Sequence, residues 1–198
     1  MRKTILFAML IAVTGVFAQT NLVKDAGFEA GKISNAKYSN AQTADWQYFV
    51  KQGNSVAITA GQAQDGGNVL CFKSNSKNEK RFNTCISQTI GVLKSSRIKV
   101  TFQAQSNQDA KIRAFVTGAR LGEDSKGKLT STNGKDVTIY QSTKFHTYTV
   151  SLSEIVGSGK TPIDFSKPLE IRLALMGDYS AAPLELFVDN VVVTYAGK

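Results

Sequence analysis

The stretch Arg97-Ile98-Lys99-Val100-Thr101-Phe102-Gln103-Ala104 alternates apolar and polar residues without a break. Side chains of a β-strand point to opposite sides in turn, so every second residue from Ile98 to Ala104 would face a core while the others face water. The same alternation recurs from Leu169 to Leu175 and from His146 to Leu152. Half-buried strands of this kind are typical of antiparallel sheets with one face on a core.

Further strand-like runs follow one another along the chain, and no stretch after the first 18 residues keeps a helical period. These runs are Val56–Thr59, Asn68–Lys73, Thr84–Ile90, Ala110–Thr117, Val137–Tyr140 and Leu184–Tyr195. Turn residues such as Asn133-Gly134 separate them, and the longest connection is Leu121–Lys135. Eight to ten strands with polar connections predict an all-β fold, a single antiparallel β-sandwich of the jelly-roll type.

Residues 1–18 have the three parts of a secretory signal peptide. Arg2 and Lys3 are basic, Ile5–Val13 is apolar, and a small-residue cleavage site ends at Ala18. The apolar stretch is too short for a good membrane span, although an uncleaved N-terminal anchor is the alternative. We therefore expect a secreted or periplasmic chain without a stable membrane anchor, in which residues 19–198 form one domain.

The net charge of the chain is +9, and it falls to +7 when Arg2 and Lys3 leave with the signal peptide. The remaining basic residues are scattered, whereas proteins that bind nucleic acids usually gather them on one face. We therefore expect no nucleic-acid partner. A solvated basic surface is the simpler interpretation, with weak attraction to acidic glycans or an anionic cell surface as the alternative.

Cys71 and Cys85 are the two cysteines of the chain. An even number of cysteines in an exported chain favours a disulfide. Both lie in strand-like runs, and adjacent antiparallel strands would bring them within bridging distance. We therefore predict a disulfide between them, with two unpaired buried thiols as the alternative. A Cys/His zinc site is excluded because the chain has one histidine.

Catalytic groups are sparse. His146, the single histidine, shares its parity with Tyr148 and Val150, so we expect it to pack in or at the edge of the sandwich and not to serve a nucleophile. The 15 acidic residues form no recognisable pair of the kind that glycosidases use. The sequence therefore predicts a protein that is not an enzyme.

Several short motifs, taken in order, resemble one family. Asn21–Gly31 ends in Gly-Phe-Glu-Ala-Gly and is followed by Trp46; Ile86–Ile90 and Phe145–Val150 match later strands, and Phe187–Val191 matches the closing strand. In this order they resemble the galactose-binding-like β-sandwich of carbohydrate-binding modules in families four, nine and twenty-two. The resemblance covers nearly all of residues 19–198.

The resemblance implies a noncatalytic carbohydrate-binding protein that captures or presents a glycan, with an oligo- or polysaccharide as its partner. It also implies one structural calcium ion where the first and last strands meet, with Glu29 and Asp189 as ligands. An extracellular protein-interaction or adhesion module, with Leu121–Lys135 facing a protein partner at the cell surface, is the alternative function. A divergent glycan-active enzyme is a further one.

Sugars have apolar C–H faces and polar rims, so their binding sites combine aromatic rings with polar side chains. The densest aromatic cluster contains Trp46 and Tyr48 on one strand face and Phe49 on the other, and one of these faces must belong to the core. Two arginines alternate with core residues and could line a sheet face. The candidate ligand-binding residues are Trp46, Tyr48, Arg113, Tyr140, Arg172 and Tyr179.

Overall fold

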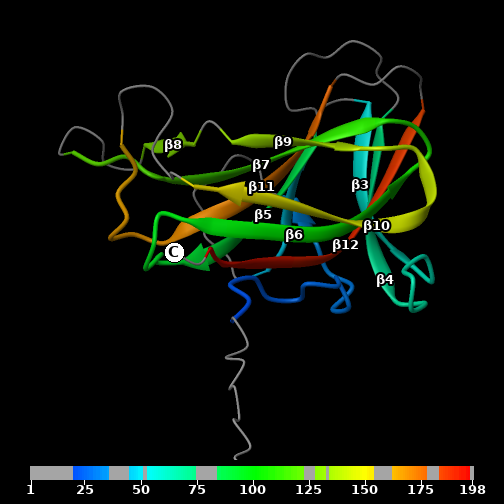
Figure 1. Cartoon of the computed structure of the whole chain (residues 1–198), viewed down its shortest axis with the longest axis horizontal. Helices are drawn as coiled ribbons and strands as arrows, with labels where there is room; N and C mark the ends of the chain where they lie inside the picture. Colours follow the sequence, from blue (N-terminus) through cyan, green and yellow to red (C-terminus); the bar gives the residue numbers. More distant parts are fainter. Residues whose placement is uncertain are drawn as a thin grey trace, which may run out of the picture.

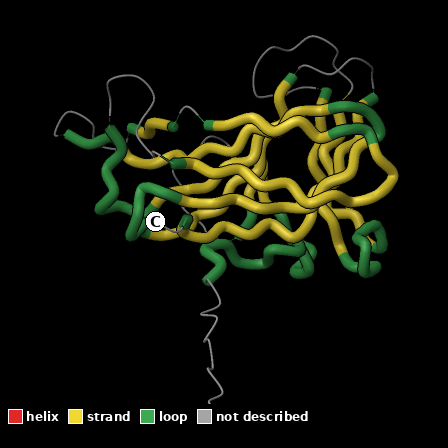
Figure 2. Tube along the Cα trace, in the orientation of Figure 1, coloured by secondary structure: helices red, strands yellow, loops and turns green. Residues whose placement is uncertain are grey.

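The computed structural model describes residues 20–35, 45–50, 53–74, 84–122, 128–132, 134–153, 162–177 and 183–196. These residues form strands and loops, and all strands belong to two sheets (Figure 2). Nowhere in these ranges is there a helix long and apolar enough to cross a membrane. The predicted signal peptide, residues 1–18, lies outside the described residues.

The first sheet has seven strands. Its order is β1 (Ser34–Asn35), β2 (Gln47–Val50), β5 (Thr84–Gly91), β11 (Leu169–Met176), β7 (Ala110–Ala119) and β8 (Leu129–Ser131), and β9 (Lys135–Ile139) also pairs with β7. The β1–β2 pairing is parallel, and the other pairings are antiparallel. The predicted long connection Leu121–Lys135 thus contains a short strand, β8.

The second sheet has five antiparallel strands. Its order is β10 (Ser142–Leu152), β6 (Ile98–Ser106), β12 (Leu184–Tyr195), β4 (Asn68–Ser74) and β3 (Asn54–Ala60). Long strands such as β6 and β12 run roughly along the molecule, while β3 and β4 stand across it (Figure 1). This open two-sheet arrangement confirms the predicted β-sandwich.

The core lies between the sheets and is built from the apolar members of each alternating strand. Burial removes apolar surface from water, which is the main favourable term in folding. The largest buried side chains are Phe28, Trp46, Leu70, Phe72, Ile86, Ile98, Phe102, Ile112, Ile139, Leu169 and Ile171. The alternation of β6 is confirmed, because Ile98, Val100, Phe102 and Ala104 are all fully buried.

The N-terminal segment Asn21–Ala26 completes the edge of β12 that β4 leaves open. β4 pairs with β12 only from Leu184 to Val188. Beyond that point the Val191 N–H donates to the Ala26 carbonyl (2.9 Å), and the Leu22 N–H donates to the Val193 carbonyl (2.7 Å). Figure 1 shows this blue segment alongside the red β12.

The resemblance implied an opening strand over Asn21–Gly31, and the structure has an irregular segment there instead. Asp25 and Phe28 have positive φ angles of 48° and 60°, far from the backbone conformation of a regular strand. For a bulky residue such as Phe28 this conformation is strained, and its fully buried ring, 5.3 Å from the Trp46 ring, holds it in place. The Trp46 indole also donates to the Asp25 carbonyl (3.0 Å).

His146 lies at the edge of the sandwich, one of the two places predicted for it, and not in the core. Its register partner is Ala104, which faces the core, but His146 itself is exposed, and its Nε2 lies 3.0 Å from the Ser142 hydroxyl oxygen. The reason is its position on β10, the outermost strand of the five-stranded sheet, next to an irregularity between Ser142 and His146. The alternation of β10 buries side chains only from Val150 onward.

The predicted disulfide is also wrong, because Cys71 and Cys85 are both free and buried. Cys71 lies in β4 of the five-stranded sheet and Cys85 in β5 of the seven-stranded sheet. These strands follow each other in the sequence without pairing, since the chain crosses from one sheet to the other between them. Adjacency in sequence therefore does not make the two strands neighbours.

Candidate functional site

The outer face of the seven-stranded sheet, on the side away from the core, has an apolar floor. Cys85, Phe115 and Ala174 form a small buried cluster there, and Phe49 packs against it. Strand register places them together: Cys85 lies between Phe49 and Ala174, and Phe115 is opposite Arg172. These positions have the opposite parity to core residues such as Ile86 and Leu173, which is why they face outward.

Two arginine–carboxylate pairs stand beside this floor. On β11, Arg172 donates from Nε and from a terminal nitrogen to the same Glu170 oxygen (3.1 and 2.7 Å). Across the β7–β9 pairing, Arg113 donates from Nε to one Asp136 oxygen (2.5 Å) and from a terminal nitrogen to the other (2.8 Å). Charge-assisted bonds of this geometry fix the planes of both guanidinium groups.

The local environment shifts the titration of two groups on this face. Hydrogen bonding by Arg113 holds the pKa of Asp136 below its ordinary value, so this carboxyl is ionised in the native protein. Burial raises the pKa of the Cys85 thiol, although the nearby Arg172 opposes the shift. Because the thiolate is the reactive form, we expect Cys85 to serve as a buried apolar group and not as a nucleophile.

The structure brings Arg113 and Arg172 together through the pairing of β7 with β11, on the side of each strand opposite to the core residues. Arg113 is opposite Ala174, and Arg172 is opposite Phe115, so the two arginines are diagonal neighbours on adjacent strands. Diagonal neighbours in a sheet lie roughly 7–8 Å apart, within reach of long side chains. Their part in ligand binding stays a prediction.

Trp46 and Tyr48 do not lie on this face but on the core side of the sheet, and their part in ligand binding stays a prediction. Trp46 is 1% exposed, and Tyr48 packs against the core. The predicted alternation of this strand is correct, but its core side is the side of Trp46. The aromatic residue that β2 presents outward is Phe49.

The two remaining aromatic candidates have different outcomes. Tyr140 is 65% exposed at the end of β9, where the chain crosses from the seven-stranded to the five-stranded sheet. It is therefore available on the surface, away from the floor around Phe115. Tyr179 lies outside the described residues.

Sequence reasoning missed four members of this face: Phe49, Phe115, Asp136 and Glu170. One signal for Glu170 was present, because a carboxylate two residues from Arg172 on a strand shares its face. Phe115 could have been found as the apolar residue out of phase with Ile112 and Ala114 in the Ala110–Thr117 run. For Asp136 there was no signal, since only the β7–β9 register places it opposite Arg113.

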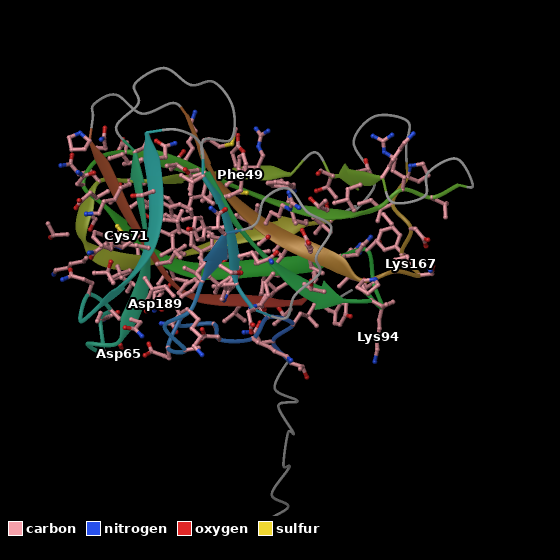
Figure 3. All side chains as sticks on the ribbon, turned by 180° about the vertical axis from the view of Figure 1, so that it is seen from behind. Phe49, Asp65, Cys71, Lys94, Lys167 and Asp189 are labelled. Atoms are coloured by element: carbon pink, nitrogen blue, oxygen red, sulfur yellow. The ribbon has the colours of Figure 1, made fainter. Side chains whose placement is uncertain are left out.

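The predicted calcium ligands also lie together, and a third carboxylate joins them. Glu29 Oε1 and Asp189 Oδ1 both lie 3.6 Å from the point that a β-carbon on Gly27 would occupy, so they flank this glycine together. In the same way Glu29 Oε1 and Asp65 Oδ1 flank Gly67, at 2.5 and 3.1 Å from its β-carbon position. Figure 3 shows Asp65 and Asp189 near the same edge of the molecule. We call Glu29, Asp65 and Asp189 the acidic cluster.

Each carboxylate of the acidic cluster accepts a backbone hydrogen bond. Glu29 accepts from the Asn68 N–H (3.1 Å), Asp65 from the Gly67 N–H (2.9 Å) and Asp189 from the Asn190 N–H (2.7 Å). Burial raises the pKa of Asp189, the Asn190 bond opposes this, and the charges of Asp65 and Glu29 raise it further.

The acidic cluster would offer a metal ion only carboxylate oxygen atoms, which are ligands that calcium prefers. The distances between these oxygen atoms fit calcium less well than their chemical type does. Among the described residues, no three Asp, Glu, His or Cys side chains stand close enough together to hold a metal ion. The cluster therefore fits calcium in ligand type, and a bound ion would have to draw the carboxylates closer.

Comparison with known proteins gives a likeness in fold. No family model and no curated protein matches the sequence. A candidate sugar-binding protein from Bacteroides thetaiotaomicron superposes with a TM-score of 0.66 at 12% identity, over 89% of this chain and 100% of the other. The CBM22-1 xylan-binding domain of Paenibacillus barcinonensis Xyn10C gives 0.50 at 16%, over 91% and 97%.

An exo-β-agarase gives a TM-score of 0.52 at 11% identity, over 90% of this chain and 25% of the agarase chain. Similarities at such identities establish architecture and leave activity open. The chain has the β-sandwich fold found in carbohydrate-binding modules.

Proposed function

We propose that this chain is an exported, noncatalytic carbohydrate-binding protein, and that the outer face of the seven-stranded sheet is its glycan-binding surface. The observation that carries the proposal is the grouping of Phe49 and Phe115 with two arginine–carboxylate pairs on one sheet face. The partly exposed ring of Phe49, supported by the buried Phe115, can complement the C–H face of a sugar, and the paired charges offer donors and acceptors to its hydroxyl groups.

The fold comparisons support this function at a coarser level, since two of the similar structures are a candidate sugar-binding protein and a xylan-binding domain. A noncatalytic role is supported by the state of the carboxylates on the face. Asp136 and Glu170 are each held by an arginine, whereas a glycosidase needs one carboxyl group kept protonated as a general acid. Export is supported by the sequence of residues 1–18 alone.

The test is a binding screen of residues 19–198 against soluble and insoluble neutral polysaccharides, including xylan and agarose. Arg172→Ala should weaken binding by at least about tenfold, because it removes a charged hydrogen-bond donor from the face. Lys73→Ala is the matched control: Lys73 is also a strand cation paired with a carboxylate, Glu185, but on the other sheet. A folded wild-type protein that binds none of these polysaccharides, or equal weakening by both variants, would refute the proposed surface.

A protein-interaction module is the second candidate, favoured by Leu121, which is 54% exposed at the start of the Leu121–Lys135 connection. Part of that connection lies outside the described residues. Binding to a cell surface that persists after Arg172→Ala but is lost after Leu121→Ser would support this candidate over the glycan surface.

We also propose that the acidic cluster binds one calcium ion that fastens the N-terminal segment to β12. Glu29 follows that segment by three residues and Asp189 belongs to β12, so an ion shared by both would hold the start of the described chain against β12. Such an ion would offset the repulsion that acts on Asp189.

The variant Asp189→Asn tests the calcium proposal in the absence and in the presence of calcium. The raised pKa of Asp189 contributes stability below the ordinary aspartate pKa of about 3.9, and this contribution is lost as the pH rises through the higher folded pKa. In chelator at neutral pH the variant should therefore melt above the wild type, by about 2–4 °C for 1 kcal/mol. Calcium should raise the melting temperature of the wild type and of Glu185→Gln, but not of Asp189→Asn. A wild type unmoved by calcium would refute the site.

A further inference from the structure

The two arginines of the outer face are already neutralised by the protein itself. Glu170 accepts from two nitrogens of Arg172, and Asp136 accepts from two nitrogens of Arg113. The side chains of Arg172 and Glu170 are only 15% and 8% exposed, so this pair lies largely out of water. The Arg113–Asp136 pair is more open, at 30% and 38%.

This local neutrality contrasts with the +9 charge of the chain. A uronate or sulfate group is bound best by a cation that can turn its paired N–H groups toward it. At Arg172 that would require displacing Glu170 and leaving a buried carboxylate without its partner, which is strongly unfavourable. Hydroxyl groups make no such demand, because they can donate to a carboxylate and accept from a guanidinium while the ion pair stays intact.

We propose that Glu170 and Asp136 are specificity-determining residues that reserve this face for neutral glycans and exclude acidic ones. The inference rests on the proposed glycan-binding function and adds the charge class of the ligand. It also assigns the exclusion to two named carboxylates. Removing either one should turn its arginine into a receptor for an acidic group.

The experiment compares neutral ligands with relatives that carry added acidic groups: mixed-linkage β-glucan with its carboxymethylated form, and xylan with glucuronoxylan. Affinities are measured by calorimetry or affinity electrophoresis at physiological ionic strength, where scattered surface charges are largely screened. The test variants are Glu170→Gln and Asp136→Asn. The control is Glu185→Gln, which removes the carboxylate partner of Lys73 on the other sheet. Circular dichroism establishes that each variant is folded, and the more exposed Asp136 supplies a variant that does not disturb a buried site.

The wild type and Glu185→Gln should prefer the neutral member of a pair by at least about tenfold, which corresponds to about 1.4 kcal/mol. Glu170→Gln and Asp136→Asn should each reduce or reverse that preference, by new binding to the acidic member that weakens as salt is added. Equal wild-type affinity for both members, or an unchanged preference in both folded variants, would overturn the inference while leaving glycan binding intact. Binding to no member of either pair, by any form of the protein, would overturn the proposed function and this inference with it.

Discussion

Cys71 and Cys85 show how one residue type can lie in two unrelated places. Cys71 is paired in register with Ala57 and Phe187 on the five-stranded sheet, whereas Cys85 is paired with Phe49 and Ala174 on the seven-stranded sheet. Burial raises the pKa of both thiols, that of Cys71 to about 11. Because the thiolate is the reactive form, each should be inert in the native protein.

A thiol titration with Ellman's reagent checks this arrangement. Native protein should react far more slowly than a free thiol at neutral pH, and protein unfolded in guanidinium without reductant should release 2 thiols per chain. Cys85→Ser should halve that number. Unreduced, unfolded wild type that shows no thiol would mean that the two cysteines are bonded.

Among the elements, the N-terminal segment depends on one side chain for much of its attachment to β12. The side-chain oxygen Oδ1 of Asn21 accepts from the Val23 N–H (3.2 Å) and the Val193 N–H (2.8 Å), and its side-chain Nδ2 donates to the Val191 carbonyl (3.3 Å). The side chain thus binds its own turn and the strand beside it.

Asn21→Ala should lower the free energy of unfolding by about 1–3 kcal/mol, since a typical net hydrogen bond contributes about 0.5–1.5 kcal/mol and part of this site can be rehydrated. Urea denaturation measures the loss, and hydrogen exchange should show faster opening at the Val193 amide. Gln64→Ala, at an exposed loop position, is the control and should leave both readouts unchanged. Equal stability of Asn21→Ala and wild type would show that the backbone contacts alone hold the segment.

For the whole molecule, alternation in the sequence predicted the strands and the β-sandwich, because the period of two follows directly from strand geometry. It did not predict which strands share a sheet. β4 and β5 look like a hairpin in the sequence but belong to different sheets, which is why the disulfide prediction was wrong.

The same limit applies to the candidate site. Parity put Arg113 and Arg172 on the outward side of their strands, but only the pairing of β7 with β11 places them on one surface. On β2, however, both sides are aromatic, so the pattern could not decide whether Trp46 or Phe49 faces the core. The decision comes from residues 25–28, where the Phe28 ring packs against the Trp46 ring and the Asp25 carbonyl accepts from the indole N–H.

The position of β12 has a consequence for how the protein is made. β12 is the last of the described strands in chain order, yet it lies in the middle of its sheet, between β6 and β4. While a ribosome is still producing residues 184–195, the facing edges of β6 and β4 have no partner, and the N-terminal segment has no strand to join. The sandwich can close only after β12 has emerged, so we expect the five-stranded sheet to stay divided until synthesis of residues 184–195 is complete.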